Sequence, residues 1–154
     1  MSSSSVCLTC QLLADRDAGT RPLWDNIYRV QFWDVVHSYN TSLPGWLVLV
    51  ARRHISAIAE MSVVEAVELG KLQRLVSIAL HQTVDCVKTY VVQFAEHPNH
   101  PHVHLHVIPR MAGMPADARG PSVFKYLGVP EEQSVSEAEM NRIAMQVKNV
   151  LESS

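Results

Sequence analysis

The sequence predicts an α+β domain built on an antiparallel sheet. Residues 102–109 begin with histidines that alternate with apolar side chains, a period of two that is typical of a half-buried strand. Two segments, 62–81 and 136–151, place apolar residues at helical spacing behind a serine, which indicates two helices. The short polar turn over 96–101 joins two strands, which should therefore pair antiparallel. Strands, a long helix, further strands and a terminal helix are typical of the α+β class.

The other strands are expected from local composition. Residues 26–38 are rich in β-branched and aromatic side chains and should form two strands with a turn near 31–34. A continuous apolar run over 46–51 predicts a buried strand after a loop at 40–45. Residues 88–95, rich in valine and tyrosine, predict the strand before the polar turn. Irregular structure is expected at 1–25, except for Cys7–Cys10 and a short apolar stretch after it, and at 124–130, while 111–120 should be a loop with glycine and proline.

Both predicted helices begin at a capping-box sequence. Ser62 is followed three residues later by Glu65, and Ser136 is followed by Glu139. One helix should therefore extend from 62 to about 81, and the other should occupy the C-terminal segment. The apolar stripes are Ala66, Leu69, Leu72, Val76 and Ala79 in the first helix, and Met140, Ile143, Ala144, Val147 and Leu151 in the second.

Length and composition restrict the class of protein. The 154 residues suit a single domain over 1–154, with a core at about 7–110 and a C-terminal segment, 111–154, that carries a helix. Hydrophobic residues make up 47% of the chain, which is enough to fill one core. The formal net charge of −2 provides no broad basic surface, so no nucleic-acid partner is expected.

The sequence lacks recognisable targeting signals and a disulfide framework, which indicates a protein of the cytoplasm. No apolar run is long enough to cross a bilayer, so no membrane partner is expected. The serine-rich stretch 1–5 lacks the basic region and apolar core of a secretory signal. Three cysteines do not suggest a disulfide framework. We therefore expect a cytoplasmic location.

The alternating histidines carry the functional signal. In a strand, His102, His104 and His106 would share one face while the apolar residues between them face the core. Three polar side chains in a row are costly to place on a strand without a use for them. Two chemistries are open: a metal site, because neutral imidazole is a common ligand, and a site where the central histidine attacks phosphorus.

The run His-Val-His-Leu-His-Val-Ile at 102–108 resembles the signature of the histidine-triad (HIT) superfamily. Upstream, Pro-Gly-Trp-Leu-Val-Leu-Val at 44–50 and Arg-Arg-His at 52–54 resemble that family's turn and strand and the basic-basic-histidine element after them. Cys-Leu-Thr-Cys at 7–10 is similar to the N-terminal pair of many bacterial members. The resemblance covers roughly residues 7–110.

The resemblance implies a HIT-like bent antiparallel sheet with one long central helix and a C-terminal helix. It also implies a homodimer in which the two sheets join into one. Family members hydrolyse or transfer nucleotides at an α-phosphate. Their substrates include dinucleoside polyphosphates, nucleoside phosphoramidates and nucleotide sugars.

The family's catalytic roles carry over to two histidines. His104 corresponds to the nucleophile, which would form a nucleotidyl-histidine intermediate that water then hydrolyses. Its second ring nitrogen must be protonated, and we expect a backbone carbonyl on the neighbouring strand to hold that proton in place. His106 corresponds to a donor beside the phosphate, expected to act as an imidazolium that stabilises developing charge.

The Cys-x-x-Cys pair changes the role expected for the first triad histidine. In members without the pair that histidine orients the nucleophile, whereas in members with it the corresponding residue ligates zinc. Here the resemblance implies a structural zinc ion on Cys7, Cys10, His54 and His102, a Cys2His2 set of the tetrahedral kind. The plainer alternative is that both cysteines are ordinary reduced thiols.

Substrate contacts are expected from the turn before the triad. Asn99 and, one strand earlier, Gln93 are candidates for binding phosphate. The family often has a Gly-Gln-Ser/Thr turn here, whereas this chain has Glu-His-Pro-Asn-His-Pro at 96–101. His97 and His100 either replace the missing donors or are ordinary loop residues.

The nucleoside pocket departs from the family pattern as well. Many members have an acidic residue or asparagine that grips the ribose, at a position that falls near Ser38 here. Asn40 is the best substitute. Trp46 stands where the family commonly has histidine, and we interpret it as a buried aromatic beside the sheet.

Two further functional classes stay open. The chain is possible as a nucleotide-binding or interaction module with little turnover, because its turn before the triad is altered and it has no acidic residue near Ser38. It is also possible as a metalloenzyme in which the triad histidines hold a catalytic metal. Metal content after substitution of His104 or His106 separates the second class from a nucleotide hydrolase.

Overall fold

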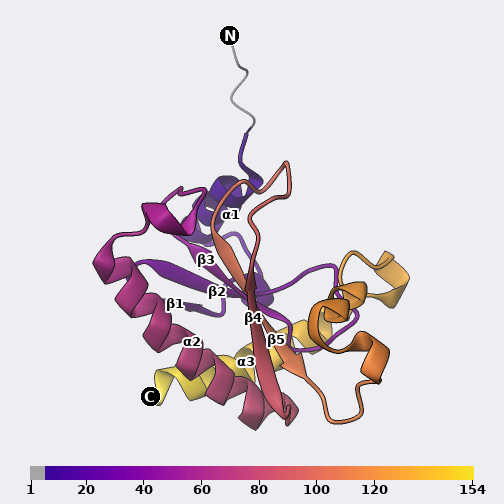
Figure 1. Cartoon of the computed structure of the whole chain (residues 1–154). Helices are drawn as coiled ribbons and strands as arrows, with labels where there is room; N and C mark the ends of the chain where they lie inside the picture. The colour runs from indigo at the N-terminus through magenta and orange to yellow at the C-terminus, as the bar shows by residue number, and fades with distance from the viewer. Residues whose placement is uncertain (1–5) are drawn as a thin grey trace.

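The structure, a computed structural model, describes residues 6–154. Residues 1–5 lie outside the described residues. The prediction that they form no secretory signal therefore concerns a stretch that the structure does not describe. The alternating segments of the sequence form a five-stranded antiparallel sheet with the order β1-β2-β3-β5-β4 (Figure 1). Its strands are β1 Tyr28–Arg29, β2 Trp33–His37, β3 Leu47–Ala51, β4 Lys88–Gln93 and β5 His104–Arg110. The predicted α+β class with an antiparallel sheet is confirmed.

In the described part of the chain, three α-helices and several 3-10 helices pack around this sheet. The α-helices are α1 Leu8–Asp17, α2 Val63–Val84 and α3 Glu137–Glu152. The 3-10 helices are Leu23–Asp25, Ile58–Glu60, Ala116–Ala118, Gly120–Tyr126 and Glu131–Gln133. Among residues 6–154, no helix combines the length and the apolar character that crossing a membrane requires.

One face of the sheet packs against α2 and α3 and forms the larger core. Leu49 and Leu105 lie opposite each other on β3 and β5, and both are buried against this core. The predicted stripes of both helices contact it except at Ala66, which is exposed, and Met140, which is buried outside this cluster. Each fully buried aliphatic side chain contributes about 1.5–3 kcal/mol. This layer fixes the sheet on which the histidines stand.

The other face of the sheet carries the histidines. Val48 lies opposite His106 and Val50 opposite His104, so these four side chains share one face. A second apolar cluster covers part of this face, with contributions from α1 and from the segment 111–127. The histidines occupy the part of this face between α1 and the segment 111–127.

The expectation of mostly irregular structure before residue 26 was wrong for the described residues 6–25, because α1 and a 3-10 helix form there. The buried residues of α1 are Thr9, Leu13 and Arg16, of which one is apolar. A helix held by polar contacts has no apolar stripe, so hydrophobic periodicity does not reveal it. The segments 111–120 and 124–130 also contain 3-10 turns rather than irregular loop alone.

The triad strand begins later than predicted. β5 starts at His104, because the backbone N–H of His102 still donates to the His100 carbonyl within the preceding turn, at 2.8 Å. His102 therefore does not share the strand face with His104 and His106. Its side chain is fully buried and points toward α1 instead.

The helix ends follow the capping sequences in part. The Ser62 hydroxyl accepts from the backbone N–H of Glu65, and the Glu65 carboxylate accepts from the backbone N–H of Ser62. The first capping box is therefore confirmed. The second box is half formed, because Ser136 caps the backbone of Glu139 while the Glu139 carboxylate pairs with Arg142. Other boundaries differ slightly: α2 ends at 84, β4 at 93, β3 begins at 47, and the turn between β1 and β2 occupies 30–32.

Candidate active site and metal centre

A cleft of about 220 Å³ opens on the histidine face of the sheet. Its walls come from β5 and the loop before it, from α1, and from the end of β2. Five histidines are among the lining residues: His37, His97, His100, His104 and His106. The cleft therefore holds a cluster of imidazoles over an otherwise mostly apolar floor.

The ring proton of His104 is fixed by the main chain. Its Nδ1 lies 2.7 Å from the carbonyl oxygen of His102, which can only accept, so Nδ1 carries the proton. Nε2 then keeps a free lone pair at the cleft. The carbonyl was expected on the neighbouring strand, and that expectation was wrong: it comes from the turn two residues earlier in the chain.

His106 has the opposite arrangement. The indole Nε1–H of Trp46 donates to His106 Nδ1 at 3.0 Å, and an indole nitrogen can only donate. In the neutral ring the proton of His106 therefore lies on Nε2. Burial, followed by the nearby His104, lowers the pKa of His106 to about 4, so this ring is neutral at pH 7. The expectation of an imidazolium is corrected accordingly.

Aromatic residues enclose His106. Phe124 from the C-terminal segment meets the rings of His106 and Trp46 edge-on, with centroids 5.6 and 5.4 Å away. The segment after the triad thus forms one wall of the site, a role that no motif in the sequence indicates. Phe94, which directly follows β4, contacts Phe124 in turn.

The altered turn over 96–101 is ordered by α1. Thr9 Oγ1 lies 2.8 Å from His100 Nδ1, and the backbone N–H of Leu8 donates to the Asn99 carbonyl at 2.9 Å. The N–H of Asn99 donates to His97 Nδ1 at 3.1 Å, which closes the turn. His97 and His100 line the cleft, whereas Asn99 is not among its lining residues.

The two other substrate-binding candidates separate. Asn40 lines the cleft, and its backbone carbonyl accepts from the backbone N–H of Gly128 at 2.9 Å. Gln93 lies opposite Leu105 in the β4–β5 register, so it belongs to the sheet face that packs on the helices. The structure therefore brings Asn40 to the histidines and does not bring Gln93 there.

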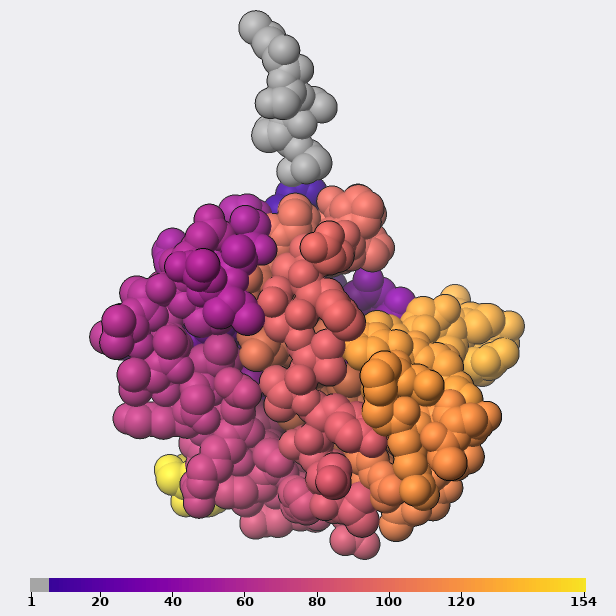
Figure 2. All heavy atoms as spheres, viewed as in Figure 1, coloured from indigo at the N-terminus to yellow at the C-terminus, as the bar shows by residue number. Residues whose placement is uncertain are grey.

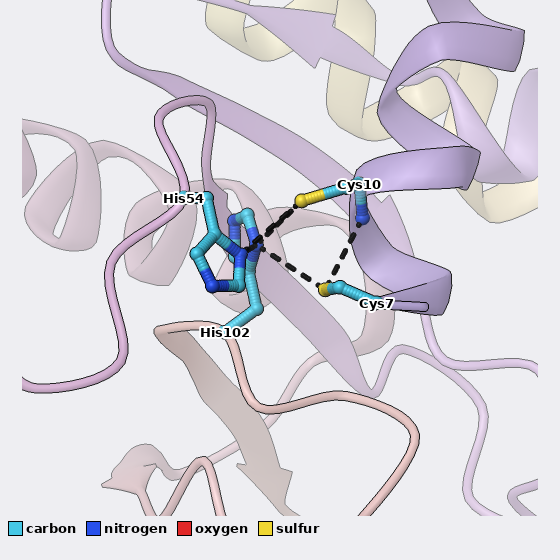
Figure 3. A group of neighbouring side chains, drawn as sticks. All are labelled: Cys7, Cys10, His54 and His102. Carbon is cyan, nitrogen blue, oxygen red and sulfur yellow. Dashed lines mark hydrogen bonds between the residues drawn. The ribbon is translucent and has the colours of Figure 1, made fainter. Parts of the chain in front are cut away.

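The four predicted zinc ligands meet beside this cleft (Figure 3). The two thiols come from the start of α1, and the two imidazoles come from the loops after β3 and before β5. Cys10 Sγ lies 3.2 Å from His54 Nδ1 and 3.5 Å from His102 Nδ1. Cys7 Sγ lies 3.7 Å from His102 Nδ1, and the two Nδ1 atoms are 3.1 Å apart.

These separations match the edges of a zinc tetrahedron. Ordinary Zn–S and Zn–N bond lengths at tetrahedral angles give S···N edges of about 3.6 Å and an N···N edge of about 3.3 Å. All four ligand atoms lie within 4.8 Å of one another. The geometry and the donor set therefore both suit one tetrahedral ion.

His102 presents the correct nitrogen to this centre. Its Nε2 lies 2.5 Å from the carbonyl oxygen of Ala51, so Nε2 carries the proton and Nδ1 points its lone pair at the thiols. Burial is the main cause that lowers the pKa of His102, which keeps the ring neutral, as a metal ligand must be. Burial and the adjacent Cys7 raise the pKa of the Cys10 thiol to about 11, so without a cation this thiol stays protonated.

The far end of α1 is held by buried ion pairs. Arg16 donates to the Asp34 carboxylate at 3.0 Å and to the carbonyl oxygen of Asp25 at 2.8 Å. The side chains of Arg16 and Asp34 are each 2% exposed. Arg29 pairs with the same Asp34 carboxylate at 2.6 Å. α1 is thus anchored through Cys7 and Cys10 at its start and through Arg16 near its end.

Sequence reasoning missed part of this site. Trp46 was interpreted as core packing, and it is indeed fully buried, but its N–H has a specific acceptor. A buried indole nearly always needs such a partner, which was the available signal. Phe124 and Thr9 reach the histidines through tertiary packing that no local pattern indicates.

Comparison with known proteins shows the fold. No protein-family model matches the sequence, and no curated protein matches it. The chain is similar to a zinc-bound histidine triad family protein from Mycobacterium smegmatis, with 15% identity, coverage of 96% of each chain and a TM-score of 0.66. A histidine triad protein from Marinobacter aquaeolei is 24% identical over 83% of this chain and 88% of its own, with a TM-score of 0.67.

A named enzyme also shares this fold. The diadenosine triphosphate hydrolase of Plasmodium falciparum is 14% identical over 83% of this chain and 76% of its own, with a TM-score of 0.59. At identities this low the similarity is evidence of fold alone. The chain has the histidine-triad fold, as the resemblance of its motifs implies.

Proposed function

We propose that the protein is a histidine-triad nucleotide hydrolase or nucleotidyl transferase that acts at an α-phosphate through a nucleotidyl-His104 intermediate. The observation that carries the proposal is the pair of opposite tautomers at the cleft. His104 offers a lone pair on Nε2, and His106 offers a proton on Nε2. One ring is prepared to attack phosphorus, and the other to bind a phosphate oxygen.

The reaction would take two steps. In the first, His104 Nε2 forms a bond to the α-phosphorus, and the bond to the leaving oxygen breaks with its electron pair on that oxygen. The ring of His104 then carries a positive charge, which its Nδ1–H shares with the His102 carbonyl. In the second step water attacks phosphorus, the P–N bond returns its electron pair to Nε2, and the proton of the water passes to solvent or phosphate. A different acceptor in place of water makes the reaction a transfer.

The lining of the cleft suggests how a nucleotide would bind. We assign the ribose hydroxyls to Asn40 and the outer phosphates to His97 and His100, which line the cleft in place of the usual turn. The candidate substrates are dinucleoside polyphosphates, nucleoside phosphoramidates and nucleotide sugars. The diadenosine triphosphate hydrolase with the same fold supports the first of them.

We further propose that Cys7, Cys10, His54 and His102 hold a structural zinc ion. The zinc-bound relative from Mycobacterium smegmatis and the tetrahedral spacing of the ligand atoms support this assignment. Such an ion supplies cross-linking rather than chemistry at the substrate, because no open coordination position would remain. It would hold α1 against the turn that contains the His102 carbonyl.

A homodimer is proposed through β4, which is an edge strand of the sheet. Figure 2 shows this strand running down the face of the molecule between α2 and the orange C-terminal segment. Val91 is 43% exposed and Phe94 is 58% exposed, so the edge offers apolar side chains as well as free backbone groups. Pairing of two β4 strands would join the two sheets into one.

A nucleotide-binding module with little turnover is the second candidate. The observation that favours it is the turn over 96–101, which has no glycine and no hydroxyl side chain to approach a phosphate. A metalloenzyme based on the triad has less support. Within residues 6–154 the histidine and cysteine ligands gather around His102, whereas His104 and His106 each have Nδ1 engaged by a hydrogen bond.

Turnover by matched variants tests the proposal. Wild type, His104→Ala and His81→Ala are assayed on a dinucleoside polyphosphate, a phosphoramidate and a nucleotide sugar. His81 is an exposed histidine of α2 and serves as the control. We expect turnover by wild type and His81→Ala and none by His104→Ala. Equal turnover by His104→Ala would remove the mechanism, and tight nucleotide binding without turnover would favour the binding module.

A further inference from the structure

We propose that Trp46 is a positioning residue that keeps His106 a neutral Nε2–H donor, and that it thereby restricts the reaction to leaving groups that depart as anions. This inference rests on the proposed function, because a leaving group exists only if His104 attacks phosphorus. It concerns a position where the family that the sequence resembles is expected to have a histidine. A histidine there could donate or accept, whereas an indole can only donate.

The hydrogen bond from Trp46 is held rigidly. The indole is fully buried and meets Phe124 edge-on at 5.4 Å. The Trp46 carbonyl accepts from the backbone N–H of Ser38 at 2.8 Å, which ties the residue to the end of β2. Rotation of the indole away from His106 would leave a buried N–H without a partner, and that is unfavourable. The Trp46 N–H therefore stays directed at Nδ1 of His106.

This contact opposes protonation of His106. An imidazolium has protons on both nitrogens, so the Nδ1 proton would point directly at the Trp46 N–H in a buried site. Phe124 on the other side offers no acceptor. The ring centroid of His104 lies 5.2 Å from that of His106, and this neighbour also disfavours a positive charge on His106. The other titratable groups that line the cleft are His37, His97, His100, Arg16, Asp25 and Tyr39.

A neutral donor suits one class of leaving group. When a P–O bond of an anhydride breaks, the departing phosphate oxygen keeps the electron pair as an anion, and a hydrogen bond from His106 Nε2 stabilises it. When a P–N bond of a phosphoramidate breaks, the departing amine must gain a proton as it leaves. Neutral imidazole is a poor acid, so His106 held in this state cannot supply that proton efficiently. We therefore expect the protein to favour dinucleoside polyphosphates and nucleotide sugars over phosphoramidates.

Nitrogen NMR of histidine-labelled protein tests the positioning without any substrate. In wild type, His106 should show a proton-bearing Nε2 and a bare Nδ1, and should stay so as the pH falls below 6. In Trp46→Phe, which keeps an aromatic ring and removes the donor, the pKa of His106 should rise. Trp33→Phe is the matched control, because the buried Trp33 indole donates to the Glu65 carbonyl, away from the cleft.

The spectra are decisive in two ways. A proton on Nδ1 of His106 in wild type would overturn the proposal, even if Trp46→Phe fails to fold. An unchanged pKa of His106 in a folded Trp46→Phe would overturn it as well. The spectra do not depend on turnover, so they decide the role of Trp46 even if the proposed function fails.

The leaving-group restriction is tested by the ratio of kcat/KM for an anhydride to that for a matched phosphoramidate of the same nucleoside. Wild type and Trp33→Phe should share a ratio well above one, and Trp46→Phe should lower it roughly tenfold, the effect of one hydrogen bond. A wild-type ratio of one or less, or an unchanged ratio in Trp46→Phe, would overturn the restriction. No turnover of either class would overturn the proposed function and the restriction together.

Discussion

His104 and His106 lie two residues apart on the same face of β5 and carry their ring protons on opposite nitrogens. The His102 carbonyl holds a proton on Nδ1 of His104, and the Trp46 indole leaves Nδ1 of His106 bare. One partner can only accept and the other can only donate, so each tautomer follows from its neighbour. His102 has its own acceptor at Ala51 and turns its lone pair toward the thiols. Three histidines in one short run thus have three different hydrogen-bond environments.

Zinc content should follow the thiols and not the triad nucleophile. We expect one zinc ion per chain in wild type and in His104→Ala, and loss of the ion in Cys10→Ser, because the tetrahedron loses a thiolate. The third cysteine supplies the control: Cys86 is buried away from the cluster, so Cys86→Ala should retain the ion. Metal analysis by mass spectrometry measures this. Full zinc in Cys10→Ser would refute the assigned ligand set.

Asp34→Asn should destabilise the fold by about 3 kcal/mol. The substitution leaves the buried Arg16 guanidinium with Asp25 alone, 3.6 Å away, and an underpaired buried charge typically costs 3–5 kcal/mol. Urea denaturation measures the free energy of unfolding. The control is Glu139→Gln, which removes an exposed pair with Arg142 on α3 and should cost less than about 1 kcal/mol. Equal effects of the two variants would show that the network does not anchor α1.

Stability should fall as the pH drops from about 6.5 to about 4. Burial lowers the pKa of His37 and of His106 to about 4, while the unfolded chain takes up these protons near 6.5. The unfolded state therefore binds more protons in this window, and the free energy of unfolding decreases by up to about 1.4 kcal/mol per pH unit for each residue. Above 6.5 the contribution of these two groups is complete and constant.

Urea denaturation across this pH range checks the slope. His37→Gln keeps a polar side chain near the Gly45 N–H, which His37 Nε2 accepts at 3.0 Å, and it does not titrate. Its slope between pH 4 and 6.5 should be shallower than that of wild type, while His81→Gln should match wild type. A His37→Gln slope equal to the wild-type slope would rule out the stated origin of the pH dependence.

Val91→Lys should convert a dimer into a monomer. A lysine at the centre of β4 places a charge on the edge that is proposed to pair, and charged edge strands resist pairing. Val63→Lys is the control, because Val63 is exposed at the start of α2, outside β4. Sedimentation equilibrium gives the mass of each variant. A monomeric wild type, or a Val91→Lys variant that stays dimeric, argues against the β4 interface.

The sequence predicts the elements whose pattern is local. Alternation placed His104 and His106 on one face, because the apolar residues between them pack on the helix side of the sheet. The resemblance to a known signature implies that Cys7, Cys10, His54 and His102 form one site, and their ligand atoms do lie close together. The α+β class followed from the order of the elements.

What the sequence did not predict depends on tertiary contacts. α1 is held by Thr9 at His100 and by buried charge at Arg16, so it has no apolar stripe to detect. His102 leaves the strand face because the chain is still turning there, a feature of the loop conformation that alternation ignores. The acceptor of Trp46 lies 60 residues away in the chain, and only the fold brings the two together.

Trapping the covalent intermediate is the most direct test of the account. The protein is incubated with a panel of dinucleoside polyphosphates, phosphoramidates and nucleotide sugars, quenched, and analysed by peptide mass spectrometry. We expect a nucleotide adduct on His104 in wild type, with a mass that identifies the transferred group, and no adduct in His104→Ala. An adduct on another residue, or turnover without any adduct on His104, would contradict the mechanism.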